Sequence, residues 1–207
     1  MAETTLERVL AGEHDVAVTP LDALAAARER WLAGERLDMG DLAAELGTSR
    51  ATLYRWVGSK ERLLGEVLWS VAERAFARAR RDARGTGAAY VADTTELYLS
   101  ASIGFAPLRR FLEQEPEYAL KVMASKHSPM QRRSIAATRE VLAEQVAKGA
   151  LDPPLDLDAL AYLIVRIGES FLYSDVITGN EPDVATAADA VYALLSAPRV
   201  RRRRRRR

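Results

Sequence analysis

The sequence predicts an all-α fold, and three of its patterns support that prediction. Apolar residues recur every three or four positions through most of the 207 residues, which is the spacing of one helix face. Ser, Thr or Asp precedes many of these segments, and Gly or Pro separates them, as is usual at helix ends. No segment of convincing length alternates apolar and polar residues in the manner of a half-buried strand. We therefore expect about ten helices and no sheet.

Three short helices are predicted in the first part of the chain. Thr19 and Pro20 mark the first start, because Thr is a favoured N-cap and Pro suits the first helical position. Asp38 and Ser49 are expected to cap the next two helices. The three segments span residues 19–34, 38–47 and 48–58, and each ends at a Gly. Two short helices that meet at a Gly predict a helix-turn-helix, so residues 19–66 are expected to form an N-terminal three-helix domain.

A fourth, long helix is predicted to start at Ser59, directly after the third. It keeps the helical period as far as Gly85. Roughly 25 residues at about 1.5 Å each give a rod of about 35–40 Å. Such a rod begins inside the helix-turn-helix and ends elsewhere, so it can act as a lever. A long packed helix without a signalling role is the alternative.

Residues 67–198 are predicted to form a second, larger helical domain. Its further helices are expected over residues 88–102, 105–112, 117–124, 129–147, 157–176 and 183–195. The segment Leu157–Tyr173 is apolar on nearly all sides, which indicates burial on more than one face. One of those faces is expected to meet a second copy of the chain, with residues 184–195 as its neighbour. This predicts a homodimer with a four-helix interface.

The composition excludes several classes of site. The chain has no Cys, which excludes disulfides, thiolate metal sites and Cys nucleophiles. Its two imidazoles, His14 and His127, are far apart in the sequence, and no catalytic or phosphate-loop motif occurs. We therefore expect no enzyme, no metal and no cofactor.

The net charge of +1 conceals an acidic chain. Arg201–Arg207 supplies seven positive charges, so the remainder carries −6. This basic tail, at residues 199–207, is expected to be disordered through self-repulsion. The arm at residues 1–18 starts with acidic and polar residues and is not expected to be a signal peptide. No apolar stretch is long enough for a bilayer, so we expect a cytoplasmic protein without membrane contact.

Residues 48–62 form a basic island within this acidic chain. Their charged side chains are those of Arg50, Arg55, Lys60 and Arg62, against Glu61 alone. A recognition helix presents its first residues to base edges, and flanking groups hold phosphates. We expect Arg50, Ala51 and Arg55 to face bases of double-stranded DNA, with a solvated charged face as the alternative. The candidate DNA contacts are Thr48, Ser49, Arg50, Ala51, Thr52, Tyr54, Arg55, Trp56 and Lys60.

Three segments together resemble the TetR/AcrR family of bacterial repressors over residues 20–65. They are Leu42–Gly47, Thr48–Tyr54 and Gly58–Leu63. The resemblance implies a helical, ligand-sensing, dimeric remainder, and it implies that Tyr54 and Lys60 contact phosphates while residues 48–55 read bases. The sequence departs from the family pattern at the start of the second helix. A Ser or Thr there often donates to a phosphate, but Asp38 or Met39 stands in its place, and the Asp38 carboxylate would repel a phosphate.

Further segments resemble the QsdR-type branch of that family. They are Tyr54–Gly58, Ser125–Ser128 and Gly168–Tyr173. This resemblance implies control of genes for breaking down lactone-type signals.

A polar stripe crosses the apolar segment at residues 157–173. Arg166 and Glu169 lie within pairing range on one helix face. They are either a structural pair at the dimer seam or part of a cluster that orients a ligand. The aromatic residues elsewhere are either ordinary core or the walls of an apolar pocket. The candidate ligand contacts are Trp69, Tyr98, Phe105, Phe111, Met123, His127, Tyr162, Arg166, Glu169 and Tyr173.

These observations predict a sequence-specific DNA-binding transcriptional regulator. We expect a ligand-released repressor that binds a palindromic operator as a homodimer and senses a small apolar effector, of lactone or acyl type, between its C-terminal helices. Its two half-sites would lie about 34–36 Å apart, or a multiple of that. The alternatives are a helical protein-interaction module and a nonspecific DNA-binding protein without an effector.

Overall fold

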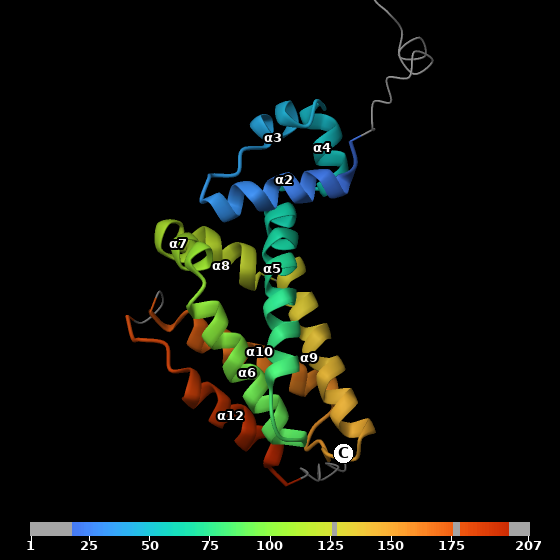
Figure 1. Ribbon diagram of the computed structural model, residues 1–207, viewed down its shortest axis with the longest axis vertical. Coiled ribbons are helices and arrows are strands. Elements are labelled where there is room, and N and C mark those ends of the chain that lie inside the picture. Colours follow the sequence, from blue (N-terminus) through green and yellow to red (C-terminus); the bar gives the residue numbers. More distant parts are fainter. Residues whose placement is uncertain (1–17, 126–127, 176–178, 199–207) are drawn as a thin grey trace, which may run out of the picture.

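The structure, a computed structural model, describes residues 18–125, 128–175 and 179–198. Within these ranges it contains ten helices and no strand, which confirms the predicted all-α fold (Figure 1). The helices are α2 (Pro20–Ala33), α3 (Met39–Glu45), α4 (Arg50–Val57), α5 (Lys60–Asp82), α6 (Gly87–Ile103), α7 (Ala106–Gln114), α8 (Pro116–Ala124), α9 (Pro129–Ala147), α10 (Leu157–Leu172) and α12 (Val184–Ser196). His127, residues 1–17 and the arginine tail lie outside the described residues.

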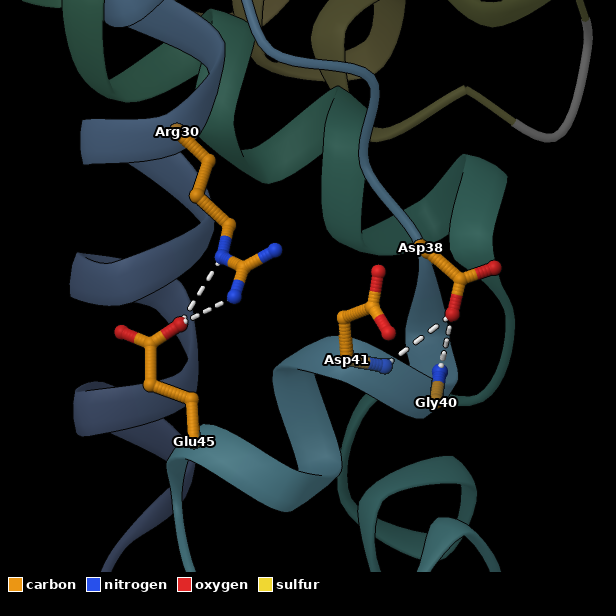
Figure 2. Close-up of polar contacts among 5 residues, drawn as sticks. All are labelled: Arg30, Asp38, Gly40, Asp41 and Glu45. Carbon is orange, nitrogen blue, oxygen red and sulfur yellow. Dashed lines mark hydrogen bonds and ion pairs between the residues drawn. The ribbon is translucent and has the colours of Figure 1, made fainter.

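Helices α2, α3 and α4 form a compact head at one end of the molecule (Figure 1). At the start of α2 the Thr19 backbone N–H donates to the Asp22 carboxylate at 2.8 Å, completing the predicted cap. Leu42 and Leu53 are fully buried in the core of the head. On its surface, Arg30 of α2 pairs with Glu45 of α3 at 2.6 Å (Figure 2). The predicted three-helix unit is therefore held by a shared core and one ion pair between helices.

Helix α5 runs from the head into the rest of the molecule (Figure 1). Its N-cap is Ser59, whose Oγ accepts the Arg62 backbone N–H at 3.2 Å. The 23 residues of α5 correspond to about 34 Å at about 1.5 Å each. It ends at Asp82 rather than at Gly85, because Ala83 has already turned to an extended backbone.

The remaining helices form the body: α6 and α9 pack against α5, α10 packs against α9, and α12 packs against α6 and α10 (Figure 1). The short helices α7 and α8 lie between the body and the head. One continuous apolar core extends from Leu42 in the head to Leu99 and Leu172 in the body. A second core cluster, around Leu142 and Leu160, fills the far end. Because head and body share a core, displacement of one is felt by the other.

The end of α10 differs from the prediction. The apolar pattern suggested a helix to residue 176, but α10 ends at Leu172 and Tyr173 is its C-cap. None of the helices in the described ranges is long and apolar enough to cross a membrane.

Candidate functional site

The outer face of α4 is a polar surface at the tip of the head. Ser49 caps the helix by accepting the Thr52 N–H at 3.1 Å, and Leu53, on the inner face of the same helix, is fully buried. This anchoring fixes which side of the helix meets solvent. The side chains on the solvent side are those of Ser49, Arg50, Ala51, Tyr54 and Arg55, all of them exposed. The structure thus gathers most of the predicted DNA contacts on one accessible face.

The other four predicted DNA contacts are only partly accessible. Thr48 and Thr52 are half-buried, and the Thr52 hydroxyl accepts a hydrogen bond from Ser49 at 3.0 Å. Trp56 is half-buried against the core and lines a polar cleft with Arg55 and other residues. Lys60 is also half-buried, because it lies against Tyr118 of α8.

The Lys60 ammonium lies over the ring of Tyr118, 5.6 Å from the ring centroid. The Tyr118 hydroxyl is buried and has no hydrogen-bond partner among the described residues. Burial, with Glu61 and Glu115 nearby, raises the pKa of Tyr118 to about 12. This contact could not be read from the sequence, because the two residues are 58 positions apart in the chain.

Asp38 lies close to the exposed face of α4. Its carboxylate accepts the backbone N–H groups of Gly40 at 2.6 Å and Asp41 at 3.0 Å (Figure 2). These two hydrogen bonds, followed by the charges of Arg50 and Lys60, lower the pKa of the Asp38 carboxyl. The residue that departs from the family pattern therefore stays ionised and is engaged in capping α3.

Helices α7 and α8 fasten the head to the body. Arg110 of α7 donates to the Leu32 carbonyl at the end of α2 at 3.1 Å. Lys121 of α8 pairs with Glu61 in the first turn of α5 at 3.2 Å. The Trp31 ring of α2 packs against the rings of Phe105, at the start of α7, and Phe111, within α7. The centroid distances are 6.1 and 6.3 Å. These contacts connect the head to α7, α8 and the start of α5 at several points, so they restrain the position of the head.

The body holds a chamber between α5, α6, α9 and α10, which we call the enclosed chamber, with a volume of about 70 Å³. Four predicted ligand contacts line it: Trp69, Tyr98, Glu169 and Tyr173. Phe76, one of the aromatic residues expected as core or pocket wall, also lines it. Sequence reasoning missed other lining residues, among them Thr95, Ser134 and Thr138, whose only signal was a hydroxyl group within a helical segment.

Glu169 gives the enclosed chamber one carboxylate. It pairs with Arg166 at 2.6 Å; the Glu169 side chain is 13% exposed and that of Arg166 is 43% exposed. Burial raises the pKa of the Glu169 carboxyl, and the opposing effect of Arg166 is smaller. Burial, with Glu169 and Tyr98 nearby, also raises the pKa of the Tyr173 hydroxyl well above its usual value. The predicted pair exists, and its acidic member also faces the cavity.

A second cavity, which we call the junction groove, lies where the head meets the body, between α2, α5, α6 and α7. Its volume is about 360 Å³, and Phe105 and Met123 of the predicted set line it. Tyr98 borders both cavities. Phe111 lines a separate polar hollow, and Tyr162 is half exposed on α10 and lines none of the cavities described. The structure therefore divides the predicted ligand set instead of joining it in one pocket.

The comparisons with known proteins agree with this architecture. Residues 86–196 match the family model described as "Tetracyclin repressor-like, C-terminal domain". A comparison with curated protein sequences gives no match.

Among solved structures, the chain is similar to the transcriptional repressor QsdR, from the TetR family, of R. erythropolis. The identity is 33%, the match covers 90% of this chain and 98% of that chain, and the TM-score is 0.82. A transcriptional regulator of Rhodococcus sp. RHA1 shares the fold at 23% identity and a TM-score of 0.52, covering 87% of this chain and 97% of that one. The family model spans more than half of the chain, and the first structure matches nearly all of it. The chain therefore belongs to the TetR family of transcriptional regulators.

Proposed function

We propose that this TetR-family regulator is a ligand-released repressor that binds a palindromic operator as a homodimer. Its effector would be a small, largely apolar molecule of lactone or acyl type. The observation that supports this most is the continuity of α5. The helix starts at the head with Lys60 and runs past both cavities of the body. Its Trp69 and Phe76 line the enclosed chamber, and its Leu68 and Val71 line the junction groove. An effector in the body would thus contact the same rigid helix that supports α4.

We propose that the exposed face of α4 reads the operator. Arg50 and Arg55 would contact guanine edges, and Ala51 would meet a thymine methyl group. Tyr54, Trp56 and Lys60 would hold phosphates. The exposure of Arg50, Tyr54 and Arg55 supports this assignment, and so does the rigid seat that Leu53 provides.

The dimer would form through α10 and α12. Tyr162 on α10 and Tyr192 on α12 are 50% and 49% exposed, so each of these two helices carries a large side chain that a second copy of the chain could cover. A two-fold axis through these helices would place two heads on half-sites about 34–36 Å apart, or a multiple of that.

The test is a fluorescence-anisotropy titration of the full chain with a palindrome taken from the DNA next to its gene. Arg50→Ala is expected to weaken binding about tenfold or more, because a bidentate guanine contact contributes about 1–3 kcal/mol. Tyr54→Ala should weaken binding to all sequences alike and make its salt dependence shallower.

Arg81→Ala is the matched control, because Arg81 is exposed at the opposite end of α5. Unchanged operator affinity in both Arg50→Ala and Tyr54→Ala would refute the assignment of the reading face.

A further inference from the structure

The junction groove differs from the enclosed chamber in size and in charge. Ligand sites for small molecules usually measure about 300–1,000 Å³. The groove, at about 360 Å³, falls within this range, whereas the chamber, at about 70 Å³, is too small to hold such a ligand by itself. Tyr98, Met130 and Leu172 line both spaces, so the two are adjacent.

The floor of the groove is apolar. It includes the buried side chains of Trp31, Leu68, Leu108 and Met123, with Phe105 half-buried beside them. No Asp or Glu is among the described residues that line it. A flexible hydrocarbon chain is the kind of group that such a surface removes from water.

Three arginines line the same groove: Arg28 from α2, with Arg74 and Arg78 from α5. None of them takes part in an ion pair or a side-chain hydrogen bond within the described residues. The neighbouring Arg30 and Arg80, in contrast, each have a Glu partner, at 2.6 Å in both pairs. Arg74 and Arg78 are one helical turn apart, where like charges repel. An anion at this place would relieve that repulsion.

We propose that the junction groove binds the anion of a medium-chain fatty acid, with its tail on the apolar floor and its carboxylate at the three arginines. Arginine suits this head group, because its planar fork donates two parallel hydrogen bonds to a carboxylate. The inference rests on the proposed function, because it names the class of effector. Since Arg28 and Trp31 belong to the head and Arg74 and Arg78 to α5, the bound anion would bridge the two.

The test is a calorimetric titration of the full chain, without DNA, with sodium decanoate and with 1-decanol. The alcohol has the same chain length and no charge, and we expect it to bind about tenfold more weakly. Arg74→Gln and Arg78→Gln should each weaken decanoate binding about three- to fivefold. Arg81→Gln is the matched control, because Arg81 is on the same helix but outside the groove, and it should bind as the native chain does.

Fluorescence locates the site, because Trp31 lines the groove and Trp69 lines the chamber. Decanoate should change the emission of the native chain and of Trp69→Phe, but much less that of Trp31→Phe. Circular dichroism confirms that each variant is folded before its binding is compared.

Four results would overturn the proposal: no decanoate binding, equal binding of the alcohol, equal affinity in the Arg74→Gln, Arg78→Gln and Arg81→Gln variants, or a signal that depends on Trp69 instead of Trp31. Operator binding by the ligand-free chain is measured separately. Its absence would refute the proposed function while the decanoate affinities remain interpretable, and its presence without decanoate binding would refute the groove proposal alone.

Discussion

The stack of Lys60 on Tyr118 predicts that α8 restrains a DNA contact. In this structure the Lys60 ammonium lies 5.6 Å from the centroid of the Tyr118 ring. If Lys60 holds a phosphate in the operator complex, it has to leave that ring first. Tyr118→Leu removes the ring and keeps an apolar side chain against Phe111, whose ring lies 6.2 Å from that of Tyr118.

The magnitude follows from the strength of such contacts. A cation over an aromatic ring contributes about 0.5–1 kcal/mol at an exposed site. Lys60 is half-buried, so the upper part of this range applies. Tyr118→Leu should therefore raise operator affinity about two- to fivefold.

The assay is operator anisotropy, performed on a double-mutant cycle. Tyr118→Leu is measured in the native chain and in Lys60→Ala, where it should have no effect on operator affinity. Tyr118→Phe is the matched control, since it keeps the ring and removes a hydroxyl that is buried without a partner among the described residues. It should leave operator affinity unchanged and leave stability unchanged or raise it by up to about 1 kcal/mol.

An unchanged operator affinity in Tyr118→Leu would refute the restraint. An equal rise in the native and Lys60→Ala backgrounds would also refute it, because the effect would then come from repacking of α8 and not from release of Lys60.

Three further predictions concern stability and are checked by thermal unfolding. Leu53→Ala should lower the free energy of unfolding by about 2–5 kcal/mol, because the Leu53 side chain on the inner face of α4 is fully buried, and it should weaken operator binding as well. Gly87→Ala should be destabilised by more than the roughly 1–2 kcal/mol of left-handed strain, because a Cβ there would lie 2.0 Å from the Ala150 carbonyl oxygen. Burial raises the pKa of Glu169, so the stability this group contributes is complete below its unfolded pKa and is lost as the pH rises through the folded pKa. Glu169→Gln avoids that loss, so its melting temperature relative to the native chain should rise from about pH 4 to about pH 7, and a constant difference would contradict the burial effect.

Local signals were sufficient to predict most helix boundaries. Thr19, Asp38, Ser49 and Ser59 are N-caps as expected, each accepting a backbone N–H of the first turn. Such caps depend on residues at most three positions away, so the sequence contains the whole interaction. The exposed face of α4 was predictable for the same reason, because helical periodicity fixes which residues share a side with Leu53.

Contacts between distant segments were not predictable. The hydrogen bond from Arg110 to the Leu32 carbonyl joins residues 78 positions apart. Aromatic spacing indicated that Trp69, Phe105 and Phe111 are inside, but burial does not reveal which cavity a side chain faces. Those three line the enclosed chamber, the junction groove and a polar hollow respectively. Assignment to a cavity depends on how α5, α6 and α7 pack, which no local pattern encodes.

The two cavities touch α5 on different sides. Trp69 and Phe76 are seven positions apart, close to two helical turns, and both line the enclosed chamber. Arg74 and Arg78, one turn apart, line the junction groove. A molecule in either space therefore meets the same rigid helix, at whose first turn Lys60 and Glu61 are held by α8. The influence of a ligand on operator binding is limited to the difference between its affinities for the free chain and for the operator-bound chain. A ligand in the groove contacts the head directly through Arg28 and Trp31, so its affinity depends on how the head is placed more strongly than the affinity of a ligand in the chamber does. Reciprocity then requires operator DNA to change decanoate affinity in the native chain by the same factor as decanoate changes operator affinity.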